Sequence, residues 1–127
     1  MLSGHGDMTV AYWVLAALLG AFYLFAGGKK LAQSKEQLAP MMGWVDRTPM
    51  WQVRVIGVVE VAGVAGLILP RATGVAPVLA LVAAIGFVIL QILASGVHLS
   101  RGEKKEVSLN VALIALAGVT VWLATVW

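Results

Sequence analysis

Hydrophobic positions come in four long blocks separated by short polar segments, rather than as alternating runs or one-sided helical stripes. The blocks cover about 9–28, 50–69, 75–97 and 107–127. Each is close to the roughly 20 apolar residues that an α-helix needs to cross about 30 Å of hydrocarbon. The pattern therefore predicts an all-α membrane protein, a four-transmembrane-helix bundle that forms a single domain over residues 1–127.

Helix ends follow from prolines and charges. Pro70 is expected to stop the second helix, and Pro77 falls in the first turn of the third, where its missing N–H costs little. Residues 1–7 are polar and glycine-rich, so we expect a flexible extension there. Lys29 and Lys30 follow the first block where a signal peptide would have a small-residue cleavage site, which predicts a mature helix instead.

The segment between the first and second blocks is too polar to span a membrane and too apolar to be a plain linker. We expect a short amphipathic segment in the membrane interface, broken at Pro40; the alternative is a loop that touches headgroups. Its apolar positions are Leu31, Leu38, Met41, Met42, Trp44 and Val45.

Composition supports the membrane assignment and excludes several functions. Hydrophobic residues make up 61% of the chain and charged residues 12%, about half the charged share of a soluble domain. The absence of cysteine excludes disulfides and thiolate chemistry within the chain. The two histidines lie far apart without ligand spacing, so no metal site is predicted. The net charge of +3 fits a membrane topology and gives no reason to expect nucleic-acid binding.

Basic residues are distributed unevenly over the polar segments. Because positive loops stay in the cytoplasm, the bias predicts that the first and third loops face the cytoplasm and that both termini face outward. The first loop with its flanks carries Lys29, Lys30, Lys35, Arg47 and Arg54, the third carries Arg101, Lys104 and Lys105, and the second carries Arg71.

Glu60 lies in the middle of the second apolar block. A carboxylate in hydrocarbon is costly, so it normally faces the bundle interior and finds a partner. Its helical neighbours Gly57 and Gly63, with Gly66 beyond, form a ridge of small residues that lets another helix approach closely. We expect Glu60 to point inward, between helix-packing glycines, roughly 9 Å deeper than Arg54.

Other intramembrane polar residues lie at a similar depth. Counted from the same side, Gln91, Asn110 and His98 are predicted to converge with Glu60, Ser95 and either Lys29 or Lys30. No aromatic cluster is evident at that depth. Glu60 is either half of a structural ion pair or a ligand group, and Gln91 and Asn110 either bond between helices or contact a ligand. His98 is either a surface histidine or part of the site. The other half of the bundle offers Tyr12, Tyr23, Thr120 and Thr125.

The chain resembles the DoxX-like family of small four-helix bacterial membrane proteins. The resemblance rests on "AGGKKL" at 26–31, "GVVEVAGVAGLILP" at 57–70 and "AAIGFVILQILASGVHL" at 83–99. It implies that the family's lysine, membrane glutamate and histidine correspond to Lys30, Glu60 and His98. Family members are described as accessory membrane components near quinone-linked or oxidative-stress enzymes, and distant relatives assist the assembly of other membrane proteins.

Three functions remain open. The first is an accessory subunit, without catalytic activity of its own, whose inner cavity binds a quinone, a lipid or a similar apolar molecule, or docks a redox partner. The second is an interaction or assembly protein that packs against another membrane protein or another copy of itself. It is favoured by the number of small residues, Gly57, Gly63, Gly66, Gly86, Ala83 and Ala84. The third is a minimal transporter of a small amphiphile, although no internal repeat is evident.

Overall fold

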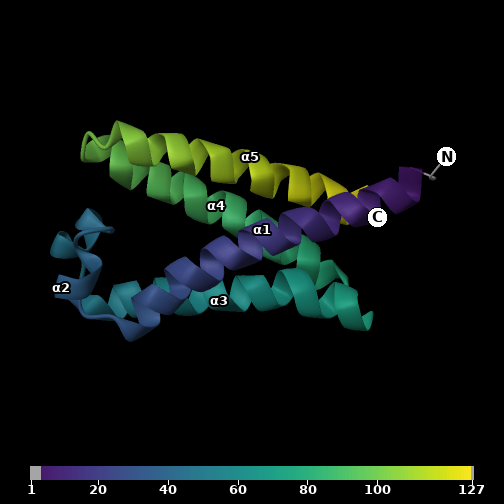
Figure 1. The fold of residues 1–127 in the computed structure, drawn as a ribbon, viewed down its shortest axis with the longest axis horizontal. Coiled ribbons are helices and arrows are strands. Elements are labelled where there is room, and N and C mark those ends of the chain that lie inside the picture. The colour runs from purple at the N-terminus through teal and green to yellow at the C-terminus, as the bar shows by residue number, and fades with distance from the viewer. Residues whose placement is uncertain (1–3, 127) are drawn as a thin grey trace.

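A computed structural model describes residues 4–126 and shows four long helices joined by short connections (Figure 1). All four are long and apolar enough to cross a membrane, which confirms the predicted fold class. The chain is a multi-pass membrane protein. The elements are α1 (Gly4–Ala32), α2 (Lys35–Leu38), the 3-10 helix η1 (Gly43–Arg47), α3 (Met50–Thr73), α4 (Val78–Ser100) and α5 (Lys104–Val126).

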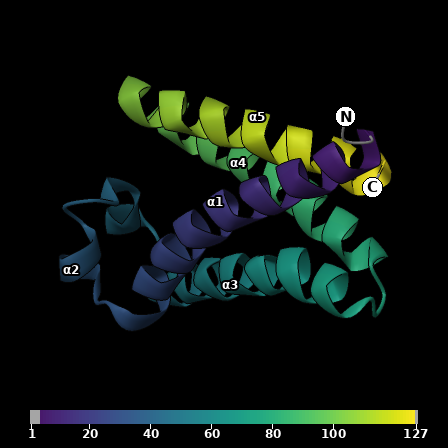
Figure 2. The ribbon, with the colours of Figure 1, turned by 45° about the vertical axis from the view of Figure 1, so that its right-hand side comes forward.

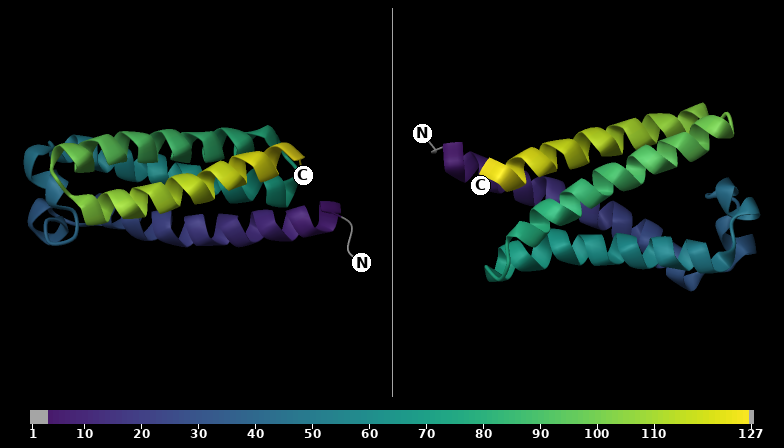
Figure 3. Two further views of the ribbon diagram at one scale, coloured as in Figure 1. Left: turned by 90° about the horizontal axis from the view of Figure 1, so that it is seen from above. Right: turned by 180° about the vertical axis from the view of Figure 1, so that it is seen from behind.

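The long helices form two pairs, α1 with α3 and α4 with α5. The pairs diverge toward the end of the bundle that carries α2, and they converge at the end that carries both termini (Figures 1 and 2). Seen from above and from behind, the termini again lie together at the converging end (Figure 3). The bundle is therefore a wedge, with its open side at the connections α1–α3 and α4–α5.

Each long helix extends past its predicted bounds at one end or both, and α4 begins at Val78, with Pro77 as its N-cap rather than inside its first turn. Two of the differences bear on specific predictions. The helix α3 continues through Pro70 to Thr73, so the predicted stop at Pro70 is wrong. A proline late in a helix removes one hydrogen bond, and the helix ends instead at Gly74, whose φ of 74° is the left-handed conformation that glycine adopts readily. At the N-terminus, residues 4–7 of the predicted extension belong to α1, and residues 1–3 lie outside the described part of the chain.

The connection between α1 and α3 folds onto the protein. Ser34 and Gln37 form a capping box that starts α2, and the chain turns at Pro40 before η1. Leu38 and Val45 are fully buried against Val53 of α3. The amphipathic character predicted for this segment thus serves to dock it beside the open side of the wedge.

The core lies where the helices converge. Its central cluster draws on all four long helices, and a second cluster lies at the terminal end. Two polar contacts fasten that end: the Tyr12 hydroxyl donates to the Leu67 carbonyl at 2.6 Å, and the Arg71 guanidinium donates to the Ala124 carbonyl at 2.5 Å. The outward faces carry large apolar side chains, as expected for surfaces in contact with lipid. The central cluster comprises Leu19, Tyr23, Val64, Leu67, Ala84, Phe87, Leu113 and Ala117.

Candidate functional site

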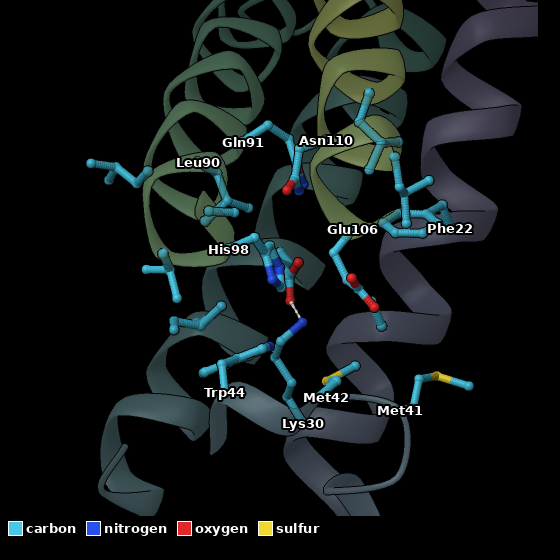
Figure 4. A pocket seen from close by; sticks show the side chains of 18 of the residues that line it. Phe22, Lys30, Met41, Met42, Trp44, Leu90, Gln91, His98, Glu106 and Asn110 are labelled. Carbon is cyan, nitrogen blue, oxygen red and sulfur yellow. Dashed lines mark hydrogen bonds and ion pairs between the residues drawn. The ribbon is translucent and has the colours of Figure 1, made fainter. Parts of the chain in front are cut away.

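A pocket of about 370 Å³ lies between the two helix pairs on the open side of the wedge. Its lining is mostly apolar and comes from α1, η1, α3, α4 and α5, with Met41 and Met42 from the turn before η1. Five of the residues predicted for the polar cluster line this pocket: Lys30, Glu60, Gln91, His98 and Asn110. Figure 4 labels all of these except Glu60. They are divided among three separate hydrogen-bonded groups.

The first group is an ion pair between α1 and α3. The Lys30 ammonium donates to Glu60 Oε1 at 2.6 Å, and both side chains are almost completely buried. Lys30 also lies 6.0 Å from the centre of the Trp44 ring, which adds a weak cation–π attraction. The choice left open between two lysines is thereby decided, since the ammonium of Lys29 lies over Phe25 instead.

Glycines allow the ion pair to form at this crossing. A Cβ atom on Gly57 would lie 2.9 Å from the carbonyl oxygen of Gly27 and 3.0 Å from the Lys30 Cβ, so the two backbones meet at a distance that only glycine permits. Arg54, one turn earlier in α3, donates to the carbonyls of Lys30 and Gln33 at 2.5 and 2.7 Å and caps the end of α1. The lysine is thus held on a helix end that α3 itself fixes.

The second group is a hydrogen-bonded chain across α1, α4 and α5. The Asn110 Nδ2 donates to Gln91 Oε1 at 2.6 Å, and Gln91 Nε2 donates to the Tyr23 hydroxyl at 2.7 Å. All three residues are buried. The Asn110 Oδ1 is buried and accepts no hydrogen bond from the described residues. Gln91 and Asn110 point into the pocket at the end opposite to Lys30 and Trp44 (Figure 4).

Tyr23 belongs to this group, although the sequence analysis assigned it to the other half of the bundle. It lies seven residues before Lys30, roughly 10 Å along the helix, which is the same interval that separates Gln91 from His98. That count was available in the sequence. It was not applied because the tyrosine was grouped with Tyr12 rather than measured from the end of its helix.

The third group lies at the mouth of the pocket. His98 Nδ1 lies 2.8 Å from Glu103 Oε1, which also accepts from Arg101 Nε at 3.1 Å. Arg101 reaches on to Asp46 of η1 at 3.2 Å and so ties the α4–α5 connection to the docked segment. The hydrogen bond from His98 and the neighbouring Arg101 charge hold the pKa of the Glu103 carboxyl below its usual value. Sequence reasoning had not identified Arg101, Glu103 or Asp46.

Aromatic side chains surround the pocket, contrary to the expectation that none cluster at this depth. Phe22, Phe25 and Trp44 belong to its lining. Behind them the rings of Tyr23 and Phe87 stack with centroids 4.1 Å apart. The sequence did not show this because the rings come from α1, η1 and α4, and only the fold brings them together.

Ser95 is the one predicted member of the cluster that lies outside the pocket lining. Its hydroxyl donates to the Gln91 carbonyl of its own helix at 2.8 Å. Among residues 4–126 there is also no group of histidine, aspartate and glutamate arranged to hold a metal ion. The site is thus an apolar cavity with a buried ion pair and a chain of neutral polar groups.

Such a cavity is suited to binding an apolar molecule with a small polar head. Its volume lies in the range of small-molecule sites, which combine apolar walls with a few fixed polar groups. Nothing in the described lining has the arrangement of a nucleophile activated by a base. The lining offers recognition by hydrogen bonding and by the field of the ion pair.

Comparison with known proteins gives a family match over most of the chain. The sequence pattern of the DoxX-like family matches residues 14–120, which include the ion pair, the hydrogen-bonded chain and the helices that carry them. Neither the curated proteins nor the solved structures include a match. Since the match extends over most of the chain, the protein belongs to the DoxX-like family.

Proposed function

We propose that this protein is an accessory membrane component that binds a small apolar molecule with a polar head, such as a quinone in its reduced, quinol form, in the pocket between its helix pairs. The proposal is supported chiefly by one observation, the pocket whose walls are apolar and whose end holds a buried acceptor, Asn110 Oδ1, without a hydrogen-bond partner. An unsatisfied buried polar atom is costly, and a ligand that pairs with it removes that cost.

The shape of the site supports a ligand that enters from the membrane or from the open side. Phe25 lines the pocket and is 56% exposed at the helix surface, so the wall continues into the lipid-facing surface. The rings of Phe22 and Trp44 provide flat apolar walls against which a ring can pack. A head group therefore lies inside, while an apolar tail extends toward lipid.

The ion pair has a defined role in this proposal. Lys30 and Glu60 neutralise each other and join α1 to α3, while their field acts on the pocket between the helix pairs. A redox function would require a partner protein or the bound molecule itself to carry electrons, because the chain contains no cysteine. The accessory role near a redox system is the one that the family resemblance implies.

The alternative function, an interaction or assembly protein, was favoured by the number of small residues, but most of these residues pack within the chain. Ala83 lies against Gly66, Phe87 covers Gly63, and Gly57 meets Gly27, so these residues are used for packing within the chain. Gly86 alone of the set faces open space, since a Cβ there would meet no atom within 4 Å. Packing inside the bundle thus explains most of the small residues without a partner.

We further propose a location in the bacterial cytoplasmic membrane with both termini outside. Lys29 and Lys30 lie in the last turn of α1, Arg54 near the start of α3 and Arg101 between α4 and α5, so they lie at the open end of the wedge, which would then face the cytoplasm. The pocket is lined by Lys30 and by His98 from the last turn of α4, so it lies in the half of the bundle that this orientation places toward the cytoplasm. A partner enzyme on the inner side would meet the docked segment and the mouth of the pocket.

The test is to extract the protein from its own membrane in mild detergent and to identify bound molecules by native mass spectrometry. Ala94 lines the pocket, so Ala94→Phe should fill it and release the adduct, while leaving the ion pair in place. Ile92→Phe is the matched control, because it places the same ring on the outward face of α4, where Ile92 is 55% exposed.

A stoichiometric apolar adduct in the wild type and in Ile92→Phe, absent from a folded Ala94→Phe variant, is the expected result. Circular dichroism and the unfolding temperature establish that the variants are folded. Retention of the adduct in Ala94→Phe would show that it binds elsewhere. A wild-type protein without any low-mass adduct that also fails to bind added quinols would refute the proposal.

A further inference from the structure

We propose that the pocket selects ligands with a neutral head group that donates a hydrogen bond, such as an alcohol or a phenol. Asn110 Oδ1 is the atom that accepts this hydrogen bond. This inference rests on the proposed function and specifies the chemistry of the ligand. It is carried by two observations on the pocket: the direction of the hydrogen-bonded chain, and the state of the charged groups in the lining.

The direction of the chain determines which atom of Asn110 remains available. Its Nδ2 is engaged by Gln91 Oε1, and the Gln91 amide is in turn engaged by the Tyr23 hydroxyl. The atom left over at the end of the chain is the carbonyl oxygen, which is buried. A carbonyl oxygen accepts and never donates, so a ligand that satisfies it must supply an O–H or an N–H.

The charged groups argue against an anionic head. Lys30, the one lysine or arginine in the described lining, lies 2.6 Å from Glu60, and the His98 ring lies 2.8 Å from Glu103. A second carboxylate, Glu106, also lines the pocket. An anion would therefore enter a site whose positive charge is already neutralised and which contains further negative charge, and like charges repel. Fatty acids and anionic phospholipids are excluded on these grounds.

A cationic head is disfavoured at the same point. The Lys30 ammonium lies in the same cavity as Asn110, and moving a second ammonium into an apolar pocket costs far more than moving a hydroxyl. Glu60 is already paired with Lys30, so Glu106 in the first turn of α5 is the one carboxylate of the described lining that would be left as a counter-ion. A neutral hydroxyl pays the smallest desolvation cost and provides the donor that Asn110 Oδ1 lacks.

The experiment titrates the detergent-solubilised protein with para-nonylphenol, para-nonylanisole and nonanoate, and follows binding by native mass spectrometry. The phenol and its methyl ether have the same ring and tail, but only the phenol donates. We expect the phenol to bind about 2- to 13-fold more tightly than the ether, the range for one net hydrogen bond between neutral groups. Nonanoate should bind more weakly than either.

Asn110→Leu removes the acceptor at similar volume and should abolish the preference for the phenol over the ether. Ser108→Ala is the control, because Ser108 is exposed on the same helix outside the pocket and should leave the preference intact. Should Asn110→Leu fail to fold, the ratio of phenol to ether in the wild type still tests the inference.

Failure of this inference is distinguishable from failure of the proposed function. Equal binding of phenol and ether, tighter binding of the ether, or binding led by nonanoate would overturn the selection for a neutral donor while leaving the pocket as a ligand site. Reversal of both amides, for example, would present Nδ2 to the ligand and favour the ether. Binding of none of the three probes, or binding that Ala94→Phe leaves unchanged, would count against the pocket itself.

Discussion

The buried ion pair between Lys30 and Glu60 provides the sharpest test of how α1 and α3, which form one of the two helix pairs, are joined. We consider three variants, Glu60→Gln, Lys30→Met and the two combined. The side chains are 7% and 4% exposed, and Nζ lies 2.6 Å from Oε1, so either single change leaves a charge buried without its counter-ion. Breaking a buried pair in this way typically costs about 3–5 kcal/mol.

The double variant should cost much less than the sum of the two losses. With both charges gone, no unpaired ion remains in the apolar interior, and buried pairs replaced by neutral groups of similar volume are often tolerated. We therefore expect each single variant to lose about 3 kcal/mol of unfolding free energy, and the double variant to lose about as much as one single variant rather than twice that amount. The coupling energy is then roughly 3 kcal/mol.

The assay is reversible unfolding in mild detergent by titration with a denaturing detergent, followed by circular dichroism. The same cycle on Asp46 and Arg101 is the control, since this pair is 55% and 25% exposed and should couple by less than about 1 kcal/mol. Losses for Lys30→Met and Glu60→Gln that add up in the double variant to within about 0.5 kcal/mol would refute the reasoning, because the residues would then behave as independent sites.

Two further predictions concern packing and pH. A Cβ on Gly63 would lie 2.5 Å from the ring of Phe87, which is itself buried and stacked on Tyr23, so Gly63→Ala should lower the unfolding free energy by about 1–3 kcal/mol. In the control Gly86→Ala the new Cβ meets no atom within 4 Å, so the unfolding free energy should stay the same or rise slightly. Equal effects of the two changes would contradict this packing. The pKa of Glu103 lies below its ordinary value of 4.5, firstly because His98 hydrogen-bonds to the carboxylate and secondly because Arg101 lies beside it. The ionised carboxylate therefore stabilises the fold above the unfolded pKa, and this stabilisation is lost as the pH falls through the folded pKa. The gap in unfolding temperature between wild type and Glu103→Gln should therefore be present at neutral pH and close below about pH 4.5, and a gap that persists well below that pH would show that the carboxylate charge is not its cause.

The number and extent of the membrane helices could be predicted because burial in lipid imposes one requirement on every residue of a span. Each long apolar block must satisfy its own backbone hydrogen bonds, so hydropathy alone locates it. Pro70 was misjudged because a proline near a helix end removes only one hydrogen bond, which leaves the stop to Gly74. Hydropathy determines the span, while the last turn depends on local capping.

The sequence predicted which polar residues lie at a similar depth in the membrane, but not which of them pair with each other. Lys30, rather than Lys29, lies on the face of α1 shared by Tyr23 and Gly27, at intervals of four and three residues, and that periodicity would have selected it. The direction of the Tyr23–Gln91–Asn110 chain could not be derived, because it depends on how α4 and α5 are rotated toward α1. The His98–Glu103–Arg101–Asp46 contacts depend in addition on where η1 docks.

The wedge explains why the polar residues of this bundle are concentrated at one end. Where the helices converge, side chains such as Leu67, Ala80 and Ala117 fill the space completely, and the polar contacts there reach backbone carbonyls. Where the pairs diverge, packing alone cannot close the interior, and each polar side chain must find a partner or leave an unsatisfied atom. Glu60 and Gln91 have partners within the chain, whereas the oxygen of Asn110 does not. The proposed ligand site is therefore the part of the bundle where packing and internal hydrogen bonds are both incomplete. The hydrogen-bond donor that such a ligand would supply corresponds to Asn110 Oδ1, the buried acceptor that the described chain leaves unpaired in this pocket.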